Sequence, residues 1–384
     1  MRIGVDATSW ANRRGYGRHV RSLLAAAVAL DRRNRYRFFV DADPQTGDFP
    51  AGVEVVRVRA SAPTVLAARS GGHRRASDLW SMSRALAAPD LDCLLFPTVY
   101  SYVPVFSRAF KIVIIHDVIP EKYPQYVFPT AGGRLNWRLK SLVARRQADL
   151  ILTVSEFSRR GILEHFGERP ERVKVVGEAG DPVFRVLDQS GRSEQRLLVY
   201  VGGFSPHKNL AGLLDAFGKL VARPGMEDVK LLLVGDFETD AFYSCYRDVA
   251  RRAQEPPVRG RVEFAGFVPD EELVVLLNRA TALVLPSLLE GFGLPAIEAA
   301  ACGLPVIATT ASPLPELLGA GGLFVDPGDA AGLEEAMARV VADPELRRRL
   351  RESGLQAAAA LSWDRVARDL LAVFDQVQVH AQAA

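Results

Sequence analysis

Short runs of apolar and β-branched residues alternate with helical patterns along the whole chain. The first half contains RIGV, YRFFV, VEVVRV, DCLLF, KIVII, LILTV and VKVV, and the second half contains RLLVYVG, VKLLLVG, RVEFAG, ALVLP, LPVIAT and GLFVD. Strands that are apolar on both faces and separated by helices are typical of parallel sheets with helices on both sides. The pattern therefore predicts an α/β protein with two Rossmann-like, doubly wound domains.

A polar stretch from Phe184 to Arg196 interrupts the alternation just before a fresh strand pattern begins. Polar residues with a glycine at such a point are typical of a domain boundary. We therefore expect a first domain over residues 1–186, a second domain over residues 187–361 and a terminal segment over residues 362–384.

The terminal segment reads as one amphipathic helix. Ser362 is a suitable N-cap residue, and an apolar stripe follows it at helical spacing, formed by Val366, Leu370, Leu371 and Phe374. A helix of this kind must bury its stripe against another part of the chain.

Composition excludes several classes of protein. The 384 residues include 48% hydrophobic residues, enough for sizeable cores, and the net charge of +3 gives no reason to expect a nucleic-acid partner. Cysteine occurs only at Cys93, Cys245 and Cys302, with no paired spacing, which argues against disulfides and structural zinc. With no signal-peptide pattern and no long apolar run, we expect a cytoplasmic protein that could still contact the inner membrane face.

The segment LPSLLEGFGLPAIEAAA, Leu285 to Ala301, has the pattern of a loop entering a helix after a buried strand. The first amides of a helix lack intrahelical partners and carry partial positive charge, so a diphosphate would fit there. Glu298 could accept two hydrogen bonds from a ribose diol, and Glu290 could hold hydroxyls of a sugar beyond the phosphates. The alternative is that both acids are solvated residues at the helix end and that the glycines only form a turn.

The longer segment PSLLEGFGLPAIEAAACGLPVIAT resembles the E-x7-E region of retaining, nucleotide-sugar-dependent glycosyltransferases of the GT-B fold, family 4. The resemblance covers most of the chain. It implies that Glu298 binds ribose and that Glu290 binds the donor sugar. It also implies that the backbone of the intervening turn binds phosphate and sugar, through Gly291, Phe292, Gly293 and Leu294. A family member would need no metal and no cofactor beyond the nucleoside diphosphate sugar.

The segment YVGGFSPHKNL places Lys208 shortly after the first strand of the second domain, where its charge could meet a diphosphate. Asn209 could cap the following helix. The family often has an arginine near the position of Gly203 as a second phosphate contact, and this chain lacks it. A solvated lysine is the alternative for Lys208.

In the first domain, KIVIIHDVIP places His116 and Asp117 at the exit of a buried strand, where ligands of open parallel sheets bind. The family has a histidine at this place beside the donor sugar, although a core histidine would look the same. In ANRRGYGRHV, Gly15 and Gly17 resemble a glycine-bearing loop that borders diphosphate and acceptor in the family. This loop does not match a dinucleotide-binding fingerprint.

Three further segments are candidate sites for a nucleotide base, a lipid surface or a metal. The backbone of Gly266, Phe267 and Val268 could face the nucleotide base, as its counterpart does in the family. The helix over residues 134–148 is basic and amphipathic, with its cations at Arg134, Arg138, Lys140, Arg145 and Arg146. It could contact anionic lipid through this basic face and suit a lipid-linked acceptor, although most basic helical faces are only solvated. The DAD segment from Asp41 to Asp43 has the spacing of a metal-binding DxD motif, but we expect no metal there, because it lies in a polar loop away from the proposed phosphate site.

The sequence thus favours a retaining hexosyltransferase with His116, Lys208 and Glu290 as catalytic residues. In the implied GT-B architecture, two domains face a cleft, the second holds the donor, the first forms most of the acceptor pocket, and the last helix crosses back to the first. The acceptor would be a sugar, lipid-linked or small molecule of cell-surface polysaccharide, glycolipid or natural-product synthesis. The alternatives are a GT-B epimerase or hydrolase acting on the nucleotide sugar, a degenerate nucleotide-sugar-binding module and, more distantly, a dehydrogenase.

Overall fold

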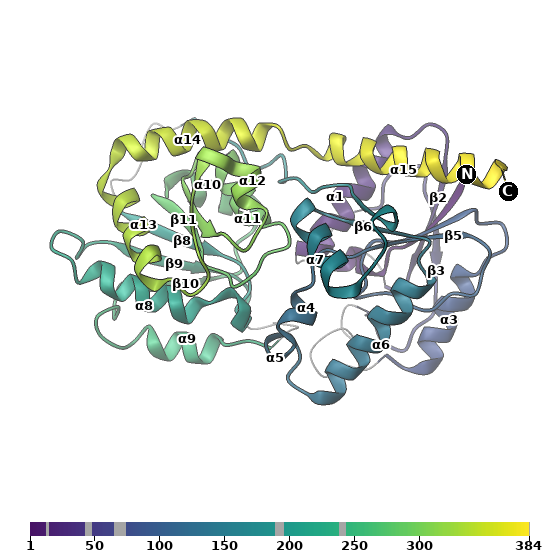
Figure 1. Cartoon of the computed structure of the whole chain (residues 1–384), viewed down its shortest axis with the longest axis horizontal. Coiled ribbons are helices and arrows are strands. Elements are labelled where there is room, and N and C mark those ends of the chain that lie inside the picture. The colour runs from purple at the N-terminus through teal and green to yellow at the C-terminus, as the bar shows by residue number, and fades with distance from the viewer. Residues whose placement is uncertain (13–14, 43–47, 65–73, 189–195, 238–242, 384) are drawn as a thin grey trace. The chain divides into compact units, whose positions relative to one another are not determined.

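The computed structural model describes residues 1–12, 15–42, 48–64, 74–188, 196–237 and 243–383 (Figure 1). The chain divides into two compact units. The first unit comprises Met1–Glu121, Phe128–Glu178 and Ser362–Ala384, and the second comprises Lys122–Val127 and Ala179–Leu361.

The chain passes from the first unit to the second after Glu178, so the predicted boundary at residues 186 and 187 lies within the second unit. Asn278 explains the difference. Its side chain accepts from Leu187 N at 2.9 Å and donates to Arg185 O at 2.9 Å, which ties this strand-free segment to the second unit. Residues 189–195 of the predicted boundary stretch lie outside the described residues.

The first unit is built on a seven-stranded sheet in the order β3-β2-β1-β4-β5-β6-β7. Every neighbouring pair is parallel, as the apolar runs predict. The strands are β1 (Arg2–Asp6), β2 (Arg35–Val40), β3 (Glu54–Arg57), β4 (Cys93–Phe96), β5 (Phe110–Ile114), β6 (Leu150–Thr153) and β7 (Val173–Val175). All residues of β4 and β6 are buried, because helices cover both faces of the sheet.

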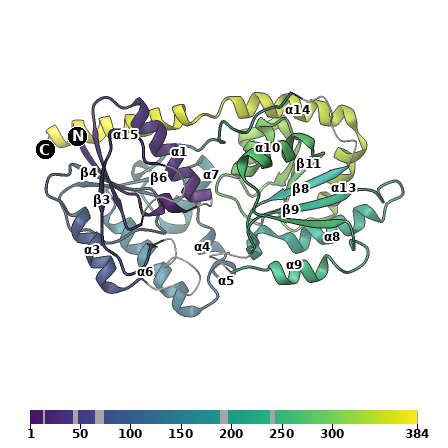
Figure 2. The same cartoon turned by 180° about the vertical axis from the view of Figure 1, so that it is seen from behind.

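The helices of the first unit form two layers around this sheet. They are α1 (Gly15–Leu30), α3 (Ala76–Leu86), α4 (Ile119–Lys122), α6 (Ala131–Gln147), α7 (Glu156–Phe166) and α15 (Trp363–Ala383). Figures 1 and 2 show α1 and α15 together on one side of the sheet and α3 and α6 on the other.

The terminal helix α15 packs against α1. Ser362 Oγ accepts from Arg365 N at 3.3 Å, so the predicted N-cap is confirmed. Val366, Leu370 and Phe374 are buried as predicted, and Phe374 also meets Tyr36 of β2. Leu371 is only half-buried, contrary to the prediction, whereas Val373 and Val377 are buried and continue the stripe along the helix.

The second unit has a six-stranded sheet in the order β10-β9-β8-β11-β12-β13, again with all pairs parallel. The strands are β8 (Leu197–Val201), β9 (Lys230–Val234), β10 (Val262–Gly266), β11 (Ala282–Leu285), β12 (Val306–Thr309) and β13 (Gly322–Val325). The helices are α5 (Pro124–Val127), α8 (Leu210–Val221), α9 (Tyr246–Arg252), α10 (Asp270–Arg279), α11 (Leu294–Ala301), α12 (Leu314–Leu318), α13 (Ala330–Ala342) and α14 (Pro344–Ala359).

In both sheets the strand order reverses beside the first strand. The reversal lies between β1 and β4 in the first unit and between β8 and β11 in the second. At such a reversal the loops leaving the two strands diverge to opposite faces of the sheet, which opens a crevice beyond their carboxyl ends. These two places are where each sheet can hold a ligand.

Candidate functional site

Lys208 and Glu290 meet at the strand reversal of the second sheet. Lys208 ends a short 3-10 turn, Pro206–Lys208, after β8, and Glu290 lies in the loop after β11. Lys208 Nζ donates to Glu290 Oε1 at 2.7 Å, and Ser287 Oγ donates to the same oxygen at 2.5 Å. Glu290 is 7% exposed, so this pair is largely shielded from water. Two residues predicted separately for the donor therefore lie in direct contact.

Backbone hydrogen bonds hold these two loops together. Leu288 N donates to His207 O at 2.8 Å, and Glu290 N donates to Ala311 O at 3.0 Å. Asn209 occupies the N-cap position of α8, but its side chain makes no capping hydrogen bond there. It donates to Pro286 O at 3.1 Å instead, across to the β11 loop. The predicted side-chain cap by Asn209 is therefore wrong, because the side chain links two loops instead. The Asn209 backbone has φ 56°, a left-handed conformation.

The turn from Gly291 to Gly293 delivers the chain into α11, which begins at Leu294 as predicted. Gly293 is the N-cap residue and has φ 90°, a conformation that residues with a Cβ rarely adopt. A Cβ there would also lie 2.9 Å from Leu314 Cδ1. Gly291, Phe292 and Gly293 are buried. Pro295, the second residue of α11, has no amide N–H, and Ala296 N donates to Gly293 O at 2.9 Å, so a ligand at this helix start would have to use the amides up to Leu294.

Glu298 lies one turn into α11 and is only 2% exposed. Gly180 passes close to it, and a Cβ on Gly180 would lie 3.4 Å from Glu298 Cγ. Burial, followed by the charge of Glu298, raises the pKa of the neighbouring Cys302 thiol to about 12. Glu298 is therefore a buried acid packed against neighbouring residues. This burial argues against the alternative that it is a solvated residue at the helix end.

The other residues predicted for the donor lie at the carboxyl ends of β8 and of β10, the edge strand two places from β8 in the sheet. Gly203 follows β8, and its carbonyl accepts from the Tyr200 hydroxyl at 2.6 Å. Gly266 ends β10 with φ 68°, and its carbonyl accepts from Gly235 N at 2.9 Å. Phe267 is 57% exposed, which leaves this loop open to a ligand.

An aromatic cluster beside these strand ends was missed in the sequence. Phe237 and Tyr246 are stacked with their ring centroids 4.1 Å apart, and Phe204 and Phe264 pack around them. The four rings come from separate segments, so no spacing along the chain indicates them. They hold the loop ends after β8, β9 and β10 in place.

In the first unit, His116 follows β5 and belongs to a buried group that includes His19 of α1. The His116 and His19 rings meet edge to face, with centroids 4.7 Å apart. Burial lowers the pKa of each histidine to about 3, so both are neutral at pH 7. His116 Nε2 is buried and, among the described residues, has no hydrogen-bond partner. The His116 ring thus keeps one nitrogen whose hydrogen-bonding capacity is unused inside the described part of the first unit.

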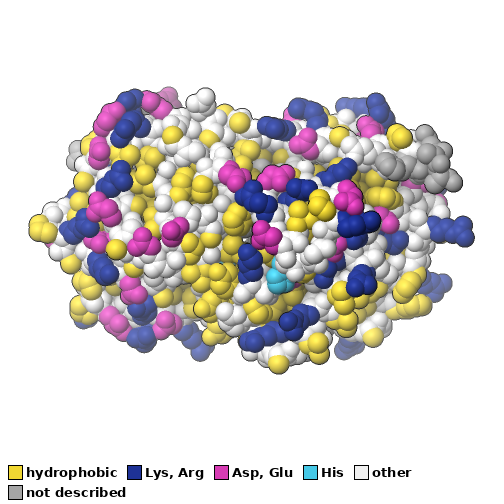
Figure 3. Space-filling view, in the orientation of Figure 1, with side chains coloured by type: hydrophobic (Ala, Val, Ile, Leu, Met, Phe, Trp, Pro, Cys, Tyr) yellow, Lys and Arg dark blue, Asp and Glu magenta, His cyan; other side chains and the backbone are white. Residues whose placement is uncertain are grey.

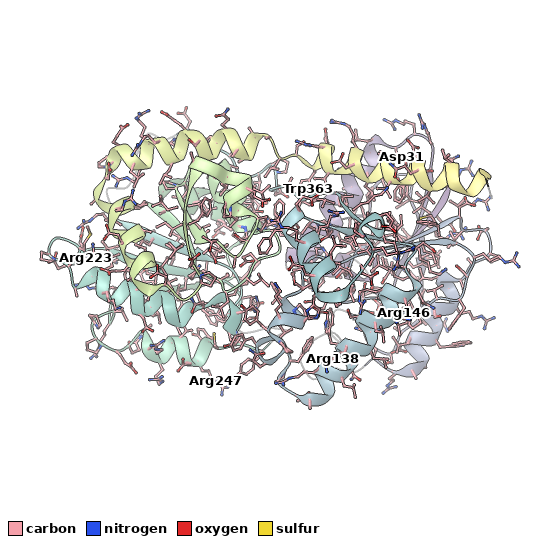
Figure 4. The ribbon with its side chains drawn as sticks, in the orientation of Figure 1. Asp31, Arg138, Arg146, Arg223, Arg247 and Trp363 are labelled. Atoms are coloured by element: carbon pink, nitrogen blue, oxygen red, sulfur yellow. The ribbon has the colours of Figure 1, made fainter. Side chains whose placement is uncertain are left out.

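Glu178 and Trp363 complete this group. Glu178 Oε1 lies 3.1 Å from His19 Nδ1, and Trp363 meets the His19 ring with centroids 5.6 Å apart. Burial raises the pKa of Glu178 to about 7. Trp363, labelled in Figure 4, is the first residue of α15. His19, Glu178 and Trp363 were not predicted, because they are adjacent only in the folded chain.

Gly15 and Gly17 differ in what they do. Gly15 begins α1, and a Cβ there would meet no atom of the described residues within 4 Å. A Cβ at Gly17 would overlap the backbone carbonyl of Asn12. Gly17 therefore lets the turn before α1 pack closely on the helix, and only Gly15 has the open surface expected beside a ligand. Arg13 and Arg14 of the same loop lie outside the described residues.

The basic helix is α6, and its cations face different ways. Arg134, Arg138 and Arg146 are exposed, and Figure 4 labels Arg138 and Arg146. Lys140 turns inward and donates to Tyr100 O at 3.1 Å. Arg145 pairs with Glu168 at 2.9 Å and covers the Phe166 ring at 3.9 Å. The interpretation of all five cations as one basic face is therefore wrong for Lys140 and Arg145.

The DAD segment provides no evidence for a metal site. Asp41 accepts from Thr64 N at 2.7 Å and also from the Thr64 hydroxyl, and Asp43 lies outside the described residues. Within the ranges that the structure describes, no three side chains of His, Cys, Asp or Glu are grouped as metal ligands.

On the drawn surface of each unit, acidic and basic side chains are interspersed (Figure 3). In the same described ranges, no helix is both long enough and apolar enough to cross a membrane.

Comparison with known proteins decides the family. A family model described as a glycosyl transferase 4-like domain matches residues 14–178, and one described as glycosyl transferases group 1 matches residues 186–357. The O-antigen chain mannosyltransferase B of Escherichia coli is 32% identical over 265 residues, which are 66% of this chain and 67% of that protein. The chain belongs to family 4 of the GT-B glycosyltransferases. It is therefore an enzyme that transfers a sugar, and the fold class expected from its strands is confirmed.

Solved structures agree on the fold. A sucrose-phosphate synthase from Thermosynechococcus elongatus superimposes with a TM-score of 0.79 at 21% identity, over 99% of this chain and 100% of that one. HepE from Anabaena, in complex with UDP-glucose, superimposes with a TM-score of 0.70 at 20% identity, over 100% of this chain and 99% of that one. At such identity the likeness establishes a two-domain GT-B fold and leaves the roles of single residues to the geometry of this glycosyltransferase.

Proposed function

We propose that this glycosyltransferase moves a hexose, with retention of anomeric configuration, from a nucleoside diphosphate sugar to an acceptor hydroxyl. The observation that carries the proposal is the contact between Lys208 and Glu290 at the strand reversal of the second sheet, next to the start of α11. That place combines a cation, a buried acid and the turn that leads into the positive end of α11, which are the groups that a sugar diphosphate needs.

In this proposal each part of the donor has its own protein group. The diphosphate binds to the amides at the start of α11 and to Lys208, because both carry positive charge. Glu298 accepts hydrogen bonds from the ribose diol, and Glu290 accepts them from sugar hydroxyls. The loop from Gly266 to Val268 lies at the end of β10, two strands from β8, and would meet the base. HepE, which has the same fold, is known in complex with UDP-glucose.

Lys208 and the α11 amides also account for catalysis. As the bond from sugar to diphosphate breaks, negative charge develops on the leaving phosphate, and donors already fixed in place stabilise it. The acceptor hydroxyl would attack from the face that the diphosphate leaves, and a phosphate oxygen would take its proton. His116 remains our candidate for a catalytic residue from the first unit, where its neutral ring could hydrogen-bond a hydroxyl. We propose that no metal is required.

We place the reaction in the synthesis of a cell-surface polysaccharide or glycolipid, as the name of the O-antigen relative suggests. Mannose is accordingly the first sugar to test. The exposed part of α6 supports contact with a membrane carrying a lipid-linked acceptor, since Leu135, Leu139 and Leu142 are exposed beside Arg134, Arg138 and Arg146. Apolar and basic side chains on one helix suit the interface of an anionic membrane.

The test of the donor is a thermal-shift screen with UDP, GDP, UDP-glucose and GDP-mannose, followed by transfer assays with the nucleotide sugar that binds. We expect one nucleotide to raise the melting temperature and its sugar to be transferred with the anomeric configuration retained, as read by NMR, with the same rate in EDTA. Inversion would refute the retaining mechanism. Release of free sugar or of an epimer, with no transfer to any acceptor, would refute the proposed transfer.

Membrane contact is tested separately by sedimentation with vesicles. We expect binding to vesicles with anionic lipid but not to neutral vesicles, and we expect Leu139→Gln to weaken it. Phe106→Gln is a matched control, because Phe106 is also exposed in the first unit but does not lie on α6. Equal binding of wild type to neutral and anionic vesicles, or no binding to either, would contradict the proposal.

A further inference from the structure

Two cations converge on one loop at the strand reversal of the first sheet. Arg74, which precedes α3, donates from Nη1 to Ser101 O at 2.8 Å. Lys140, from α6, donates from Nζ to Tyr100 O at 3.1 Å. Tyr100 and Ser101 follow β4, and the neighbouring strand β1 ends at Asp6. The two cations therefore lie at the place where this sheet can hold a ligand.

Within the described part of the chain, neither Arg74 nor Lys140 forms an ion pair, and each makes one hydrogen bond. A guanidinium has five N–H donors and an ammonium has three, so most donors of both groups remain available. Burial, and then the charge of Arg74, lowers the pKa of Lys140 to about 8. Burial likewise lowers the pKa of Arg74. Burying two positive charges close together, away from water, costs free energy unless an anion binds between them.

The nearby acids do not supply that anion. Asp6 is buried, and burial raises its pKa. One Asp6 oxygen accepts from Thr8 N at 3.2 Å and from the Thr8 hydroxyl at 2.7 Å. Asp41 and Asp78 also act on Arg74 from a distance, but they accept hydrogen bonds from Thr64 and Ser61, respectively. Asp6 acts on both Arg74 and Lys140 from a distance, but within the described residues none of these three acids forms an ion pair with either cation, so both cations keep unused donors.

Aromatic rings stand beside the same loop. Tyr100 stacks on Tyr16 with centroids 5.3 Å apart and meets Trp137 of α6 with centroids 4.9 Å apart. Trp137 Nε1 donates to Glu121 Oε1 at 2.8 Å, which fixes the indole ring. Aromatic faces bind the apolar C–H face of a sugar ring, while the adjacent cations bind an anion. The combination fits a sugar that carries phosphate.

We propose that Arg74 and Lys140 bind the phosphate or diphosphate group of the acceptor, so that the acceptor is a phosphorylated or diphosphate-linked sugar. This inference rests on the proposed function, since it names the acceptor class of that reaction. It assigns Lys140 to substrate binding, whereas the sequence placed it with the outer face of a basic helix. Phosphate on a lipid diphosphate and phosphate on a free sugar present the same chemistry to these side chains.

The test is calorimetric titration of the full chain saturated with the nucleoside diphosphate that it binds. The probes are mannose 1-phosphate, a farnesyl-diphosphate-linked mannose and, as the neutral control, methyl α-mannoside. We expect at least one phosphate-bearing probe to bind 10-fold or more tightly than the neutral one. Tighter binding of only the lipid-linked probe would assign the site to a lipid diphosphate, and tighter binding of only mannose 1-phosphate would assign it to a free sugar phosphate.

Variants make the test specific to the two cations. We expect Arg74→Gln and Lys140→Gln each to weaken the phosphate-bearing probe 10-fold or more. Lys140→Arg should retain most of the affinity, and Arg75→Gln, which removes the neighbouring exposed charge, should bind like wild type. Nucleotide affinity should be unchanged in all four variants, which also shows that they fold. Equal affinity for neutral and phosphate-bearing probes, or unchanged affinity in both Gln variants, would overturn the inference. Loss of nucleotide binding by wild type itself would instead contradict the proposed function.

Discussion

Lys208 Nζ lies 2.7 Å from Glu290 Oε1, although 82 residues separate the two in the chain. The pair joins the first loop of the second sheet to the loop beyond β11, and Ser287 donates a second hydrogen bond to the same Glu290 oxygen. In the proposed reaction Lys208 binds phosphate and Glu290 binds the sugar. The ion pair then keeps both side chains oriented before the donor arrives, and the diphosphate competes with Glu290 for the lysine.

Lys208→Ala should lower turnover about 10²-fold, because the leaving diphosphate loses one fixed positive donor. It should also destabilise the fold by a few kcal/mol, because Glu290 is left buried without its counter-charge. Turnover at saturating donor and urea unfolding measure the two effects.

The double variant Lys208→Ala, Glu290→Gln separates stability from catalysis. Neutralising the orphaned acid should recover most of the lost free energy of unfolding but none of the turnover. If Lys208→Ala retained wild-type turnover with its own substrates, the role of Lys208 at the phosphate would be wrong.

Glu298→Gln should weaken donor binding 10-fold or more and change turnover less, since the ribose contact is equally present in ground state and transition state. A ribose contact should show itself as a preference for nucleotides that carry the ribose hydroxyls. Wild type should bind a 2′,3′-dideoxy nucleotide much less tightly than the parent nucleotide, and the variant should bind both alike. Glu352→Gln, which changes an exposed acid of α14, is the matched control. A variant that still favoured the parent nucleotide as strongly as wild type does would refute the contact.

The sheets were predictable because each strand is a local pattern. Runs such as CLLF and LILT are buried along their whole length, so apolar composition alone identifies them. The turn from Glu290 to Leu294 was also predictable, since its glycines and acids lie in one segment. Here a short stretch of chain contains all the information.

Side chains whose partners are distant in sequence were not predictable. Lys140 lies in a basic segment like Arg138, yet it turns inward to Tyr100 while Arg138 stays exposed. His19 and Glu178 lie 159 residues apart and meet only after folding. Asn209 is a residue type that often caps helices, but its side chain donates a hydrogen bond to Pro286 O instead. In each case a tertiary contact overrides the local preference.

Gly293→Ala should disrupt both the fold and donor binding. The residue has φ 90°, and the new Cβ would lie 2.9 Å from Leu314. We expect the variant to lose at least about 1 kcal/mol of stability from backbone strain, together with most of its affinity for the nucleotide, because α11 would begin differently. Gly328→Ala is the matched control, since Gly328 has φ 87° and open space around it. The control should show backbone strain alone and bind nucleotide normally. Wild-type nucleotide affinity in Gly293→Ala would show that the start of α11 does not bind the donor.

Glu178 should make the free energy of unfolding fall as the pH rises, and the variant Glu178→Gln should remove this dependence. Burial raises its pKa from 4.5 to about 7, so the carboxyl binds its proton more tightly in the folded chain. A raised pKa stabilises the fold at low pH, and this contribution is lost as the pH rises from about 4.5 through 7. Glu178→Gln resembles the protonated form at every pH and escapes that loss.

The free energy of unfolding of Glu178→Gln, relative to wild type, should therefore increase by about 2 kcal/mol between pH 5.5 and pH 8. Urea unfolding at the two pH values measures it. His19 and His116 also face Glu178, but burial holds their pKa values near 3, so both stay neutral in the folded chain between pH 5.5 and pH 8 and cancel in the difference. Glu171→Gln, at an exposed acid of the same unit, should show no such change. A difference between Glu178→Gln and wild type that stayed constant with pH would mean that Glu178 keeps an ordinary pKa and that its contact with His19 offsets the cost of burial.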